Sequence, residues 1–320
     1  MTITLHAAAL RTLFVERATA KFARNVPDFV ALQKLVADNG GTFRNDHGAI
    51  RSADPAVTAL FLRAAQVLGL RRELDYRFPA KRLVSCDLQV IGEDASQFKI
   101  FVSQVDLGAF PDEIAALIRD DCARQARAVD HGPFVALIER FERRGGLSEA
   151  EAEAFVEHFV DRLMARNGPP LERSTLEAVA HLSGEAASAL ALGPDFNHVT
   201  IDVRAAAFDD IEAMAAAMQQ AGFRMLPEIQ GARGTKLRQT ATMAATQDTP
   251  VVETDGTLGV APTEKQFVEI IERNQAVDAD GHPLWQQDGR PLIFRNFLAA
   301  NAEKIFDAAS TRAGAIRVRA

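Results

Sequence analysis

Two stretches of this chain, far apart in the sequence, share one pattern of residues. The first runs from HGAIR at residue 47 to AAQVLGLR, and the second from HVTID at residue 198 to AMQQAGFR. The distance from histidine to glycine is 69 − 47 = 22 residues in the first and 222 − 198 = 24 in the second. The pattern predicts a strand and a glycine-capped helix in each stretch, as in a repeat. Two β-α-β-β-β units of this kind pair to form one cupped mixed sheet.

The repeat and its surroundings predict an α+β fold in five parts. Chance similarity between two amphipathic helices with glycine caps is the alternative to a true duplication. In the first unit, only two strands are evident after the helix, KRLVSCDLQVIG and QFKIFVSQVDL. The parts are N-terminal helices over 1–40, a first βαβββ module over 41–107, a helical insertion over 108–193, a second module over 194–275, and a C-terminal hairpin and helix over 276–320 that close the site.

Composition excludes several classes of function. The charge balance is 36 − 43 = −7, and a chain this acidic lacks the basic face that nucleic acid requires. No run of about 18 apolar residues is present, so we expect no membrane partner. The two cysteines, Cys86 and Cys122, are too few for a disulfide framework and fit a reducing, cytoplasmic location. A homodimer is compatible with the chain.

Three residues form a candidate metal site. His47 and His198 begin the first strand of each unit, so a cupped sheet would bring their imidazoles toward one centre. The segment FVEIIER places Glu269 on one strand face with Phe267 and Ile271. A carboxylate on such an apolar face is costly unless it is paired or binds a metal. Each histidine alone is more often a hydrogen-bonded structural residue than a ligand.

The corresponding strand of the first unit decides between two metal chemistries. In FKIFVS the position aligned with Glu269 is Ile100, although the register can slip by one or two residues. Two histidines, one carboxylate and open positions are typical of non-haem Fe(II) oxygenases. A fourth protein ligand would instead suit a glyoxalase-type lyase or isomerase. Glu272 and Arg273, at the end of the second strand, are expected in solvent.

Four segments together resemble the 2-oxoadipate dioxygenase/decarboxylase family, which belongs to the glyoxalase-like, vicinal-oxygen-chelate fold group. They are NDHGAIR, FNHVTIDV, LRQTAT and FVEIIER. FLAANAEKIF is also similar to a family segment that tends to read FLPVSAAGIF. The similarity runs in a consistent order from about residue 40 to 310.

The resemblance implies an Fe(II) centre held by His47, His198 and Glu269. It implies the reaction of 2-oxoadipate and O2 to 2-hydroxyglutarate and CO2, a step of lysine catabolism. It also implies that Arg51 holds the distal carboxylate of the substrate. That role is physically sensible, since Arg51 lies four residues from His47 and on the same strand face. A surface ion pair with Asp54 is the plain alternative for Arg51.

Three further residues are candidates for contact with the substrate. Arg238 and Gln239 in LRQTAT are expected to line the same cavity, although each could equally be structural. The chain has Ala300-Asn301 where the family segment has Val-Ser. Asn301 could donate to a substrate carboxylate or cap the last helix. A lyase or isomerase that uses Zn, Mn or Ni without oxygen, and a binding protein for a small acid, are the competing functions.

Overall fold

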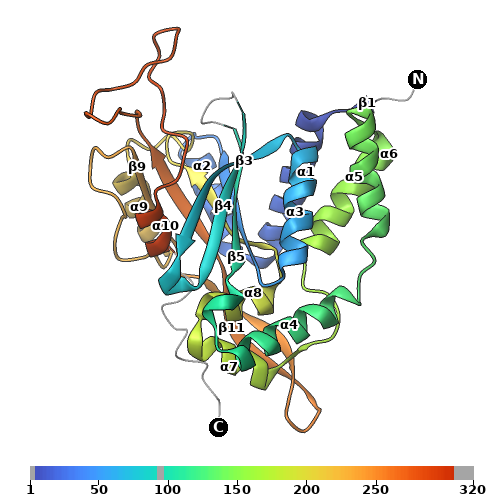
Figure 1. The fold of residues 1–320 in the computed structure, drawn as a ribbon. Helices are drawn as coiled ribbons and strands as arrows, with labels where there is room; N and C mark the ends of the chain where they lie inside the picture. Colours follow the sequence, from blue (N-terminus) through green and yellow to red (C-terminus); the bar gives the residue numbers. More distant parts are fainter. Residues whose placement is uncertain (1–3, 92–96, 306–320) are drawn as a thin grey trace.

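The computed structural model of the chain describes residues 4–91 and 97–305, and two helices come first (Figure 1). They are α1 (Ala7–Asn25) and α2 (Pro27–Asp38), preceded by the two-residue strand β1 (Thr4–Leu5). Pro27 has no N–H, and the first turn of a helix leaves that position without an intrahelical partner. The helical run therefore breaks at Val26, between the two helices.

The first unit of the repeat contains one strand more than the sequence showed. Its elements are β2 (Asn45–Ser52), α3 (Pro55–Val67), β3 (Leu70–Phe78), β4 (Leu83–Val90) and β5 (Lys99–Val105). Among the described strands, β3 pairs with β4 alone, and it is exposed along most of its length. An edge strand of this kind, with the sequence LRRELDYRF, lacks the apolar alternation by which strands are found.

The second unit has the same order of elements. They are β8 (Phe196–Asp202), α9 (Ile211–Gln220), β9 (Leu237–Ala241), β10 (Ala245–Val252) and β11 (Leu258–Arg273). Gly69 and Gly222 follow the helices of the two units with φ of +79° and +92°, the left-handed conformation predicted for both. The duplication inferred from the two short stretches is thus present in the fold.

The segment between the units is mainly helical. Its elements are α4 (Asp112–Ala126), α5 (Gly132–Arg144), β6 (Leu147–Ser148), α6 (Glu149–His158), β7 (Leu171–Glu172), α7 (Arg173–Leu182) and α8 (Gly184–Leu192). Three short helical turns complete the elements. They are η1 (Pro79–Lys81), between β3 and β4 of the first unit, η2 (Leu107–Ala109) and the π-helical η3 (Phe159–Leu163). Helix α10 (Ala299–Ile305) follows the C-terminal loops. The part of the predicted last helix beyond residue 305 lies outside the described residues.

One nine-stranded mixed sheet joins the two units. Its strand order is β3-β4-β5-β2-β8-β11-β10-β7, and β9 also pairs with β11. The first strands of the units, β2 and β8, lie side by side and antiparallel, with His47 opposite Thr200 and Ala49 opposite His198. This register relates His47 to His198 by a local two-fold axis between the strands. The predicted fold class, α+β with duplicated units, is confirmed.

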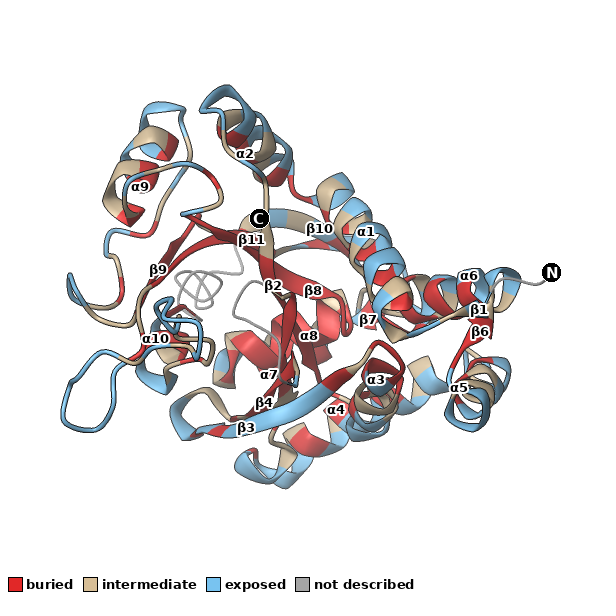
Figure 2. Cartoon of the chain, turned by 90° about the horizontal axis from the view of Figure 1, so that it is seen from above, coloured by how far each residue is buried: buried red, intermediate tan, exposed pale blue. Residues whose placement is uncertain are grey.

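The two faces of the sheet bury different sets of side chains. Ile50, Ile100 and Val199 belong to a core that helices α1, α3 and α9 cover. The alternate residues, among them Ala49 and Phe101, face a second core that includes α8 and α10. Figure 2 shows the central strands buried, with exposed helix surfaces outside them. Because side chains alternate along a strand, His47 and His198 point into the second core.

A search of the described residues finds no helix with the length and apolar character needed to cross a membrane.

Gly48, between His47 and Ala49, leaves room for an aromatic ring. A Cβ added at Gly48 would lie 2.5 Å from the buried ring of Phe196. We expect Gly48→Ala to lower the free energy of unfolding by about 1–3 kcal/mol, as overpacking of a core does. Gly108→Ala is the control, because its Cβ would meet only Asp106 at 3.4 Å. Chemical denaturation of both variants measures this, and equal stabilities would contradict the packing argument.

Candidate metal centre

The sheet brings the three predicted ligands together at one point. Strand β2 carries His47, β8 carries His198 and β11 carries Glu269, and their ligand atoms all lie within 4.8 Å of one another. Nε2 of His198 is 3.2 Å from Oε2 of Glu269, and Nε2 of His47 is 3.5 Å from the same oxygen. All three side chains are buried. The ring of His198 stacks on Phe267, 4.7 Å away between centroids.

Asp46 and Arg273 lie directly behind His47. Nδ1 of His47 is 2.8 Å from Oδ1 of Asp46, and Arg273 donates to both oxygens of that carboxylate, from Nη2 and Nε, at 2.8 Å each. A bulge in β2 between Asn45 and His47 turns Asp46 toward this side of the sheet. Arg273 is buried and not in solvent, so that expectation was wrong. Strand alternation places Arg273, four residues after Glu269, on the ligand face.

Glu272 was also wrongly expected in solvent. Its carboxylate accepts a 2.9 Å hydrogen bond from the backbone N–H of Ile211, at the start of α9. The side chain is buried on the helix-covered face and holds the helix of the second unit against its last strand. Charged residues at a strand end thus serve structure here on both faces of β11.

Thr200 stands between two of the ligands. Its hydroxyl donates to Oε2 of Glu269 at 2.9 Å and lies 3.0 Å from Nε2 of His47. Thr200 is the residue opposite His47 in β2 and opposite Glu269 in β11. The sequence analysis did not single it out, because a threonine in a strand carries no signal of its own.

The position equivalent to Glu269 in the first unit is Phe101. Glu269 pairs with Thr200, and Phe101 pairs with Ala49, the residue that the local two-fold axis relates to Thr200. The sequence alignment with Ile100 was therefore one residue out, and Ile100 belongs to the other face of the sheet. Phe101 fills the place of a fourth ligand with an apolar ring. The corrected register leaves the predicted number of protein ligands at three, because Phe101 has no donor atom in its side chain.

A small cavity adjoins the ligands. It is lined by the three ligands and by Phe101, Gln239, Phe297, Leu298, Ala302 and Ile305. Phe297 packs edge-on against His47 at 4.8 Å and against Phe101 at 5.1 Å between centroids. The segment before α10 therefore covers the centre, and most of the wall that faces the ligands is apolar.

Arg51 lies two residues after Ala49, on the same face of β2 as His47, and is buried. It does not lie on the surface, as the alternative pairing with Asp54 required, and Asp54 instead caps α3 by accepting from the N–H of Ala56. Burial lowers the pKa of Arg51, and the charge of Glu185 partly opposes this. The charge of Arg51 in turn acts on His198. A guanidinium is thus within electrostatic range of the ligand cluster.

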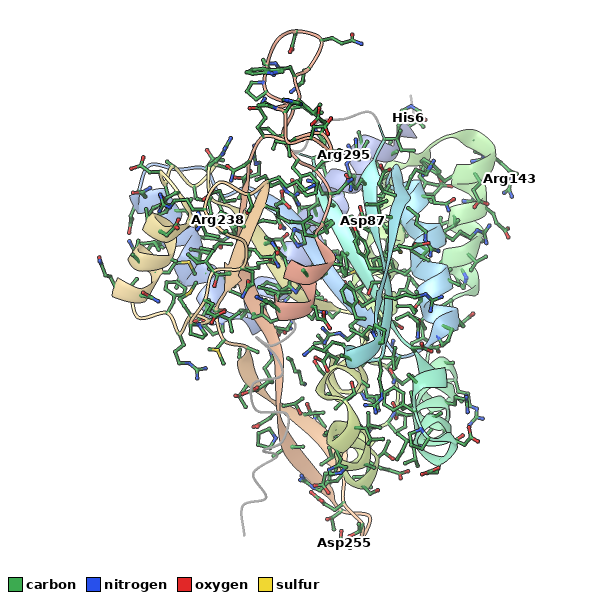
Figure 3. All side chains as sticks on the ribbon, turned by 60° about the vertical axis from the view of Figure 1, so that its left-hand side comes forward. His6, Asp87, Arg143, Arg238, Asp255 and Arg295 are labelled. Atoms are coloured by element: carbon green, nitrogen blue, oxygen red, sulfur yellow. The ribbon has the colours of Figure 1, made fainter. Side chains whose placement is uncertain are left out.

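Of the three other predicted substrate contacts, only Gln239 lines the cavity. Arg238 points to the other face of β9, where its guanidinium hydrogen-bonds Glu212 and lies 3.5 Å from Glu272 (Figure 3). That expectation was wrong, because neighbouring residues of a strand face opposite sides. Asn301 lies within α10 and does not cap it, and its amide donates to the carbonyl of Leu237 at 3.2 Å.

The ionisation of the ligands favours a cation. Burial raises the pKa of Glu269, but hydrogen bonds with His198 and His47 outweigh it and lower this pKa to about 2. Burial is the largest influence on His47, yet its bonds to Asp46 and Glu269 raise its pKa. Burial lowers the pKa of His198 and keeps that ring neutral. The cluster therefore holds a buried carboxylate beside two imidazole rings, and a bound cation would balance its charge.

The donor set and spacing fit a divalent transition metal. Two ligands at right angles around an ion, each about 2.1 Å from it, lie about 3.0 Å apart. The distances of 3.2 and 3.5 Å from Oε2 of Glu269 to the two imidazoles are close to this value. Nδ1 of His47 has Asp46 as its partner, which leaves Nε2 for the ion. Imidazole and carboxylate together suit iron, zinc, manganese or nickel.

Comparison with known proteins places this arrangement in a family. The family model of 2-oxoadipate dioxygenase/decarboxylase matches residues 14–289. No curated protein matches the chain significantly.

Several solved structures share the fold. A glyoxalase superfamily protein from Ralstonia eutropha JMP134 has a TM-score of 0.75 at 21% identity and covers 85% of both chains. Hydroxyglutarate synthase in complex with 2-oxoadipate is similar in two organisms. The protein from Oryza sativa has a TM-score of 0.70 at 18% identity, with 95% of this chain and 93% of that chain covered. The protein from Pseudomonas putida has a TM-score of 0.69 at 22% identity, with 87% and 67% covered.

These identities establish a common fold, and the family follows from the model match, which spans most of the sequence, including both histidines and Glu269. The chain is a member of the 2-oxoadipate dioxygenase/decarboxylase family of enzymes.

Proposed function

We propose that the chain is a non-haem Fe(II) enzyme that converts a 2-oxo dicarboxylic acid, 2-oxoadipate, with O2 to 2-hydroxyglutarate and CO2. The observation that carries the proposal is the set His47, His198 and Glu269 with Phe101 in place of a fourth ligand. A three-ligand face leaves positions for a chelating substrate and for oxygen. Membership of the family supports the same reaction. The cytoplasm and lysine catabolism are the proposed setting.

The chain's own residues would bind and orient the reactants. His47, His198 and Glu269 would hold the iron, which when bound supplies chelation of the 2-oxo acid and the activation of O2. The buried guanidinium of Arg51 would take the distal carboxylate through paired hydrogen bonds. Arg51 and His47 share a strand face, so the substrate would lie along β2 with its 2-oxo end at the metal.

The cavity wall would protect the reaction from water. Phe101, Phe297 and Leu298 offer no proton and no hydrogen bond. An apolar wall close to the ligands excludes the water that would otherwise quench a reactive intermediate. Gln239 supplies a polar side chain on that wall, and we propose that its amide contacts the substrate.

Oxygen uptake tests the reaction itself. Fe(II)-loaded protein given 2-oxoadipate should consume one O2 for each 2-hydroxyglutarate and each CO2 formed, because these quantities balance the reaction. An oxygen electrode and mass spectrometry of the products measure this. Turnover without oxygen on a redox-inactive metal would replace the proposal with a lyase or isomerase. Binding of the acid with no turnover would indicate a binding protein.

Loss of a ligand should remove the metal. We expect His198→Ala and Glu269→Gln each to weaken Fe(II) binding by more than about 100-fold, since even residues that only support a ligand cost 10–100-fold. Turnover should fall with the bound iron. His181→Ala, on an exposed helix surface, is the control and should retain both. Anaerobic Fe(II) titration measures the affinity, and full iron content in His198→Ala would remove this residue from the ligand set.

Arg51→Ala should act on substrate binding and leave the metal in place. We expect KM for 2-oxoadipate to rise about 10- to 100-fold, the equivalent of losing a charged hydrogen bond of about 1.5–3 kcal/mol. A 2-oxo monocarboxylic acid of the same length lacks the distal carboxylate, so its kcat/KM should change little. Arg238→Gln is the matched control, because that guanidinium is bound to Glu212. Equal losses with both acids would argue against the proposed role of Arg51.

A further inference from the structure

An ion pair crosses the sheet behind the metal ligands. In the strand order β2-β8-β11, the strands that carry Asp46 and Arg273 are not neighbours, and β8 lies between them. The guanidinium nevertheless contacts both oxygens of the carboxylate at 2.8 Å, and both side chains are 3% exposed or less. The pair therefore links two strands that are not paired with each other through their backbones.

Each partner of this ion pair is tied to a ligand through its own strand. Asp46 immediately precedes His47 and accepts from its Nδ1 at 2.8 Å. Arg273 lies on the same face of β11 as Glu269. A ring held at Nδ1 by a carboxylate can rotate less, and its tautomer leaves Nε2 for a metal. The ion pair thus sets both the orientation of His47 and its distance from the strand of Glu269.

Arg273 also holds the segment that covers the cavity. Its Nη1 donates to the backbone carbonyls of Phe294 and Asn296 at 3.2 and 2.9 Å. The guanidinium lies 5.4 Å from the centre of the Phe297 ring, and that ring packs against His47. Gln89 donates to the side chain of Asn296 as a second tie. Figure 3 labels Arg295, which belongs to this segment, and Asp87, which belongs to β4.

We propose that Asp46 and Arg273 are positioning residues of the metal centre. Through Asp46, Arg273 orients the imidazole of His47 toward the metal, and through the carbonyls of residues 294 and 296 it keeps Phe297 over the site. The proposal rests on the proposed function, in that His47 is taken as a ligand. A buried ion pair adds little stability over a well-packed apolar pair, so geometry is its specific contribution.

The test uses a double variant, because Asp46→Asn alone would leave the buried guanidinium of Arg273 without its carboxylate. Lys99, whose Nζ lies 3.6 Å from Oδ2 of Asp46, loses that neighbour in the double variant. Arg124 likewise loses Asp121 in the control below. Asp46→Asn/Arg273→Gln removes both charges and keeps side chains that can hydrogen-bond. We expect this variant to fold, as measured by circular dichroism and thermal unfolding, and to bind Fe(II) 10- to 100-fold more weakly under anaerobic conditions. The visible spectrum of its Co(II) form should change, because that spectrum reports ligand geometry and not activity.

A matched pair elsewhere provides the control. Arg166 donates to both oxygens of the buried Asp121 at 2.6 and 2.9 Å, within the helical insertion. Asp121→Asn/Arg166→Gln should lower stability by a comparable amount and leave Fe(II) affinity and the Co(II) spectrum unchanged. Hydrogen–deuterium exchange over residues 294–297 should accelerate in the Asp46/Arg273 double variant and not in this control.

The outcomes separate this proposal from the proposed function. Wild-type Fe(II) affinity, an unchanged Co(II) spectrum and unchanged exchange in the folded double variant would overturn the positioning role. His47→Ala is measured in parallel, and wild-type affinity there would overturn the ligand assignment itself. If the double variant does not fold, Arg273→Lys replaces it. Lysine keeps the charge but cannot bind two carboxylate oxygens and two carbonyls together, so weaker Fe(II) binding is again expected and unchanged binding contradicts the proposal.

Discussion

The antiparallel pairing of β2 with β8 is the interaction on which the site depends. It sets His47 opposite Thr200 and Ala49 opposite His198, so that two residues about 150 positions apart in the chain share one point on one face of the sheet. A slip of one residue in this register would turn one histidine to the opposite face of the sheet, into the core of Ile50, Ile100 and Val199. Gly48 and the ring of Phe196 pack on that other face directly behind the ligands, which ties the register to the packing.

The third ligand and its supports follow from the same sheet. Because β11 runs parallel to β8, Glu269 lies beside Thr200, and the hydroxyl of Thr200 bridges toward both Glu269 and His47. The ion pair of Asp46 and Arg273 then joins β2 to β11 across β8. Two backbone pairings and one buried ion pair therefore position all three predicted ligands.

The sequence was sufficient to predict what depends on local pattern. The glycine caps at Gly69 and Gly222, the face of Glu269 and the shared face of His47 and Arg51 all follow from helical and strand periodicity. Alternation carried two residues beyond Ile271 would also have placed Arg273 on the ligand face. Arg273 was expected in solvent because a charged residue at the end of a strand is usually exposed.

Other features depend on contacts that no local pattern encodes. The bulge that turns Asp46 toward Arg273 exists only when β2 is paired with β8, and the edge strand β3 is defined by its pairing with β4. Only the register of β5 against β2 shows that Phe101, and not Ile100, occupies the position equivalent to Glu269. Asn301 joins α10 to β9 through the carbonyl of Leu237, a contact between elements distant in sequence.

The proposed function depends on positions where the two units depart from their symmetry. His47 and His198 occupy equivalent positions of the two units, which the duplication alone explains. At two other pairs of equivalent positions the residues differ: Phe101 corresponds to Glu269, and Arg51 corresponds to Asp202. A symmetric centre would have four protein ligands and no side reserved for a substrate. Phe101 leaves one side of the proposed metal site without a protein ligand. Arg51 places a cation on the β2 side, whereas the equivalent position on the β8 side holds Asp202, whose carboxylate pairs with Arg44. In the proposed function, a 2-oxo dicarboxylic acid would place its 2-oxo end at the metal and its distal carboxylate at Arg51, so this departure from symmetry would orient the substrate along β2.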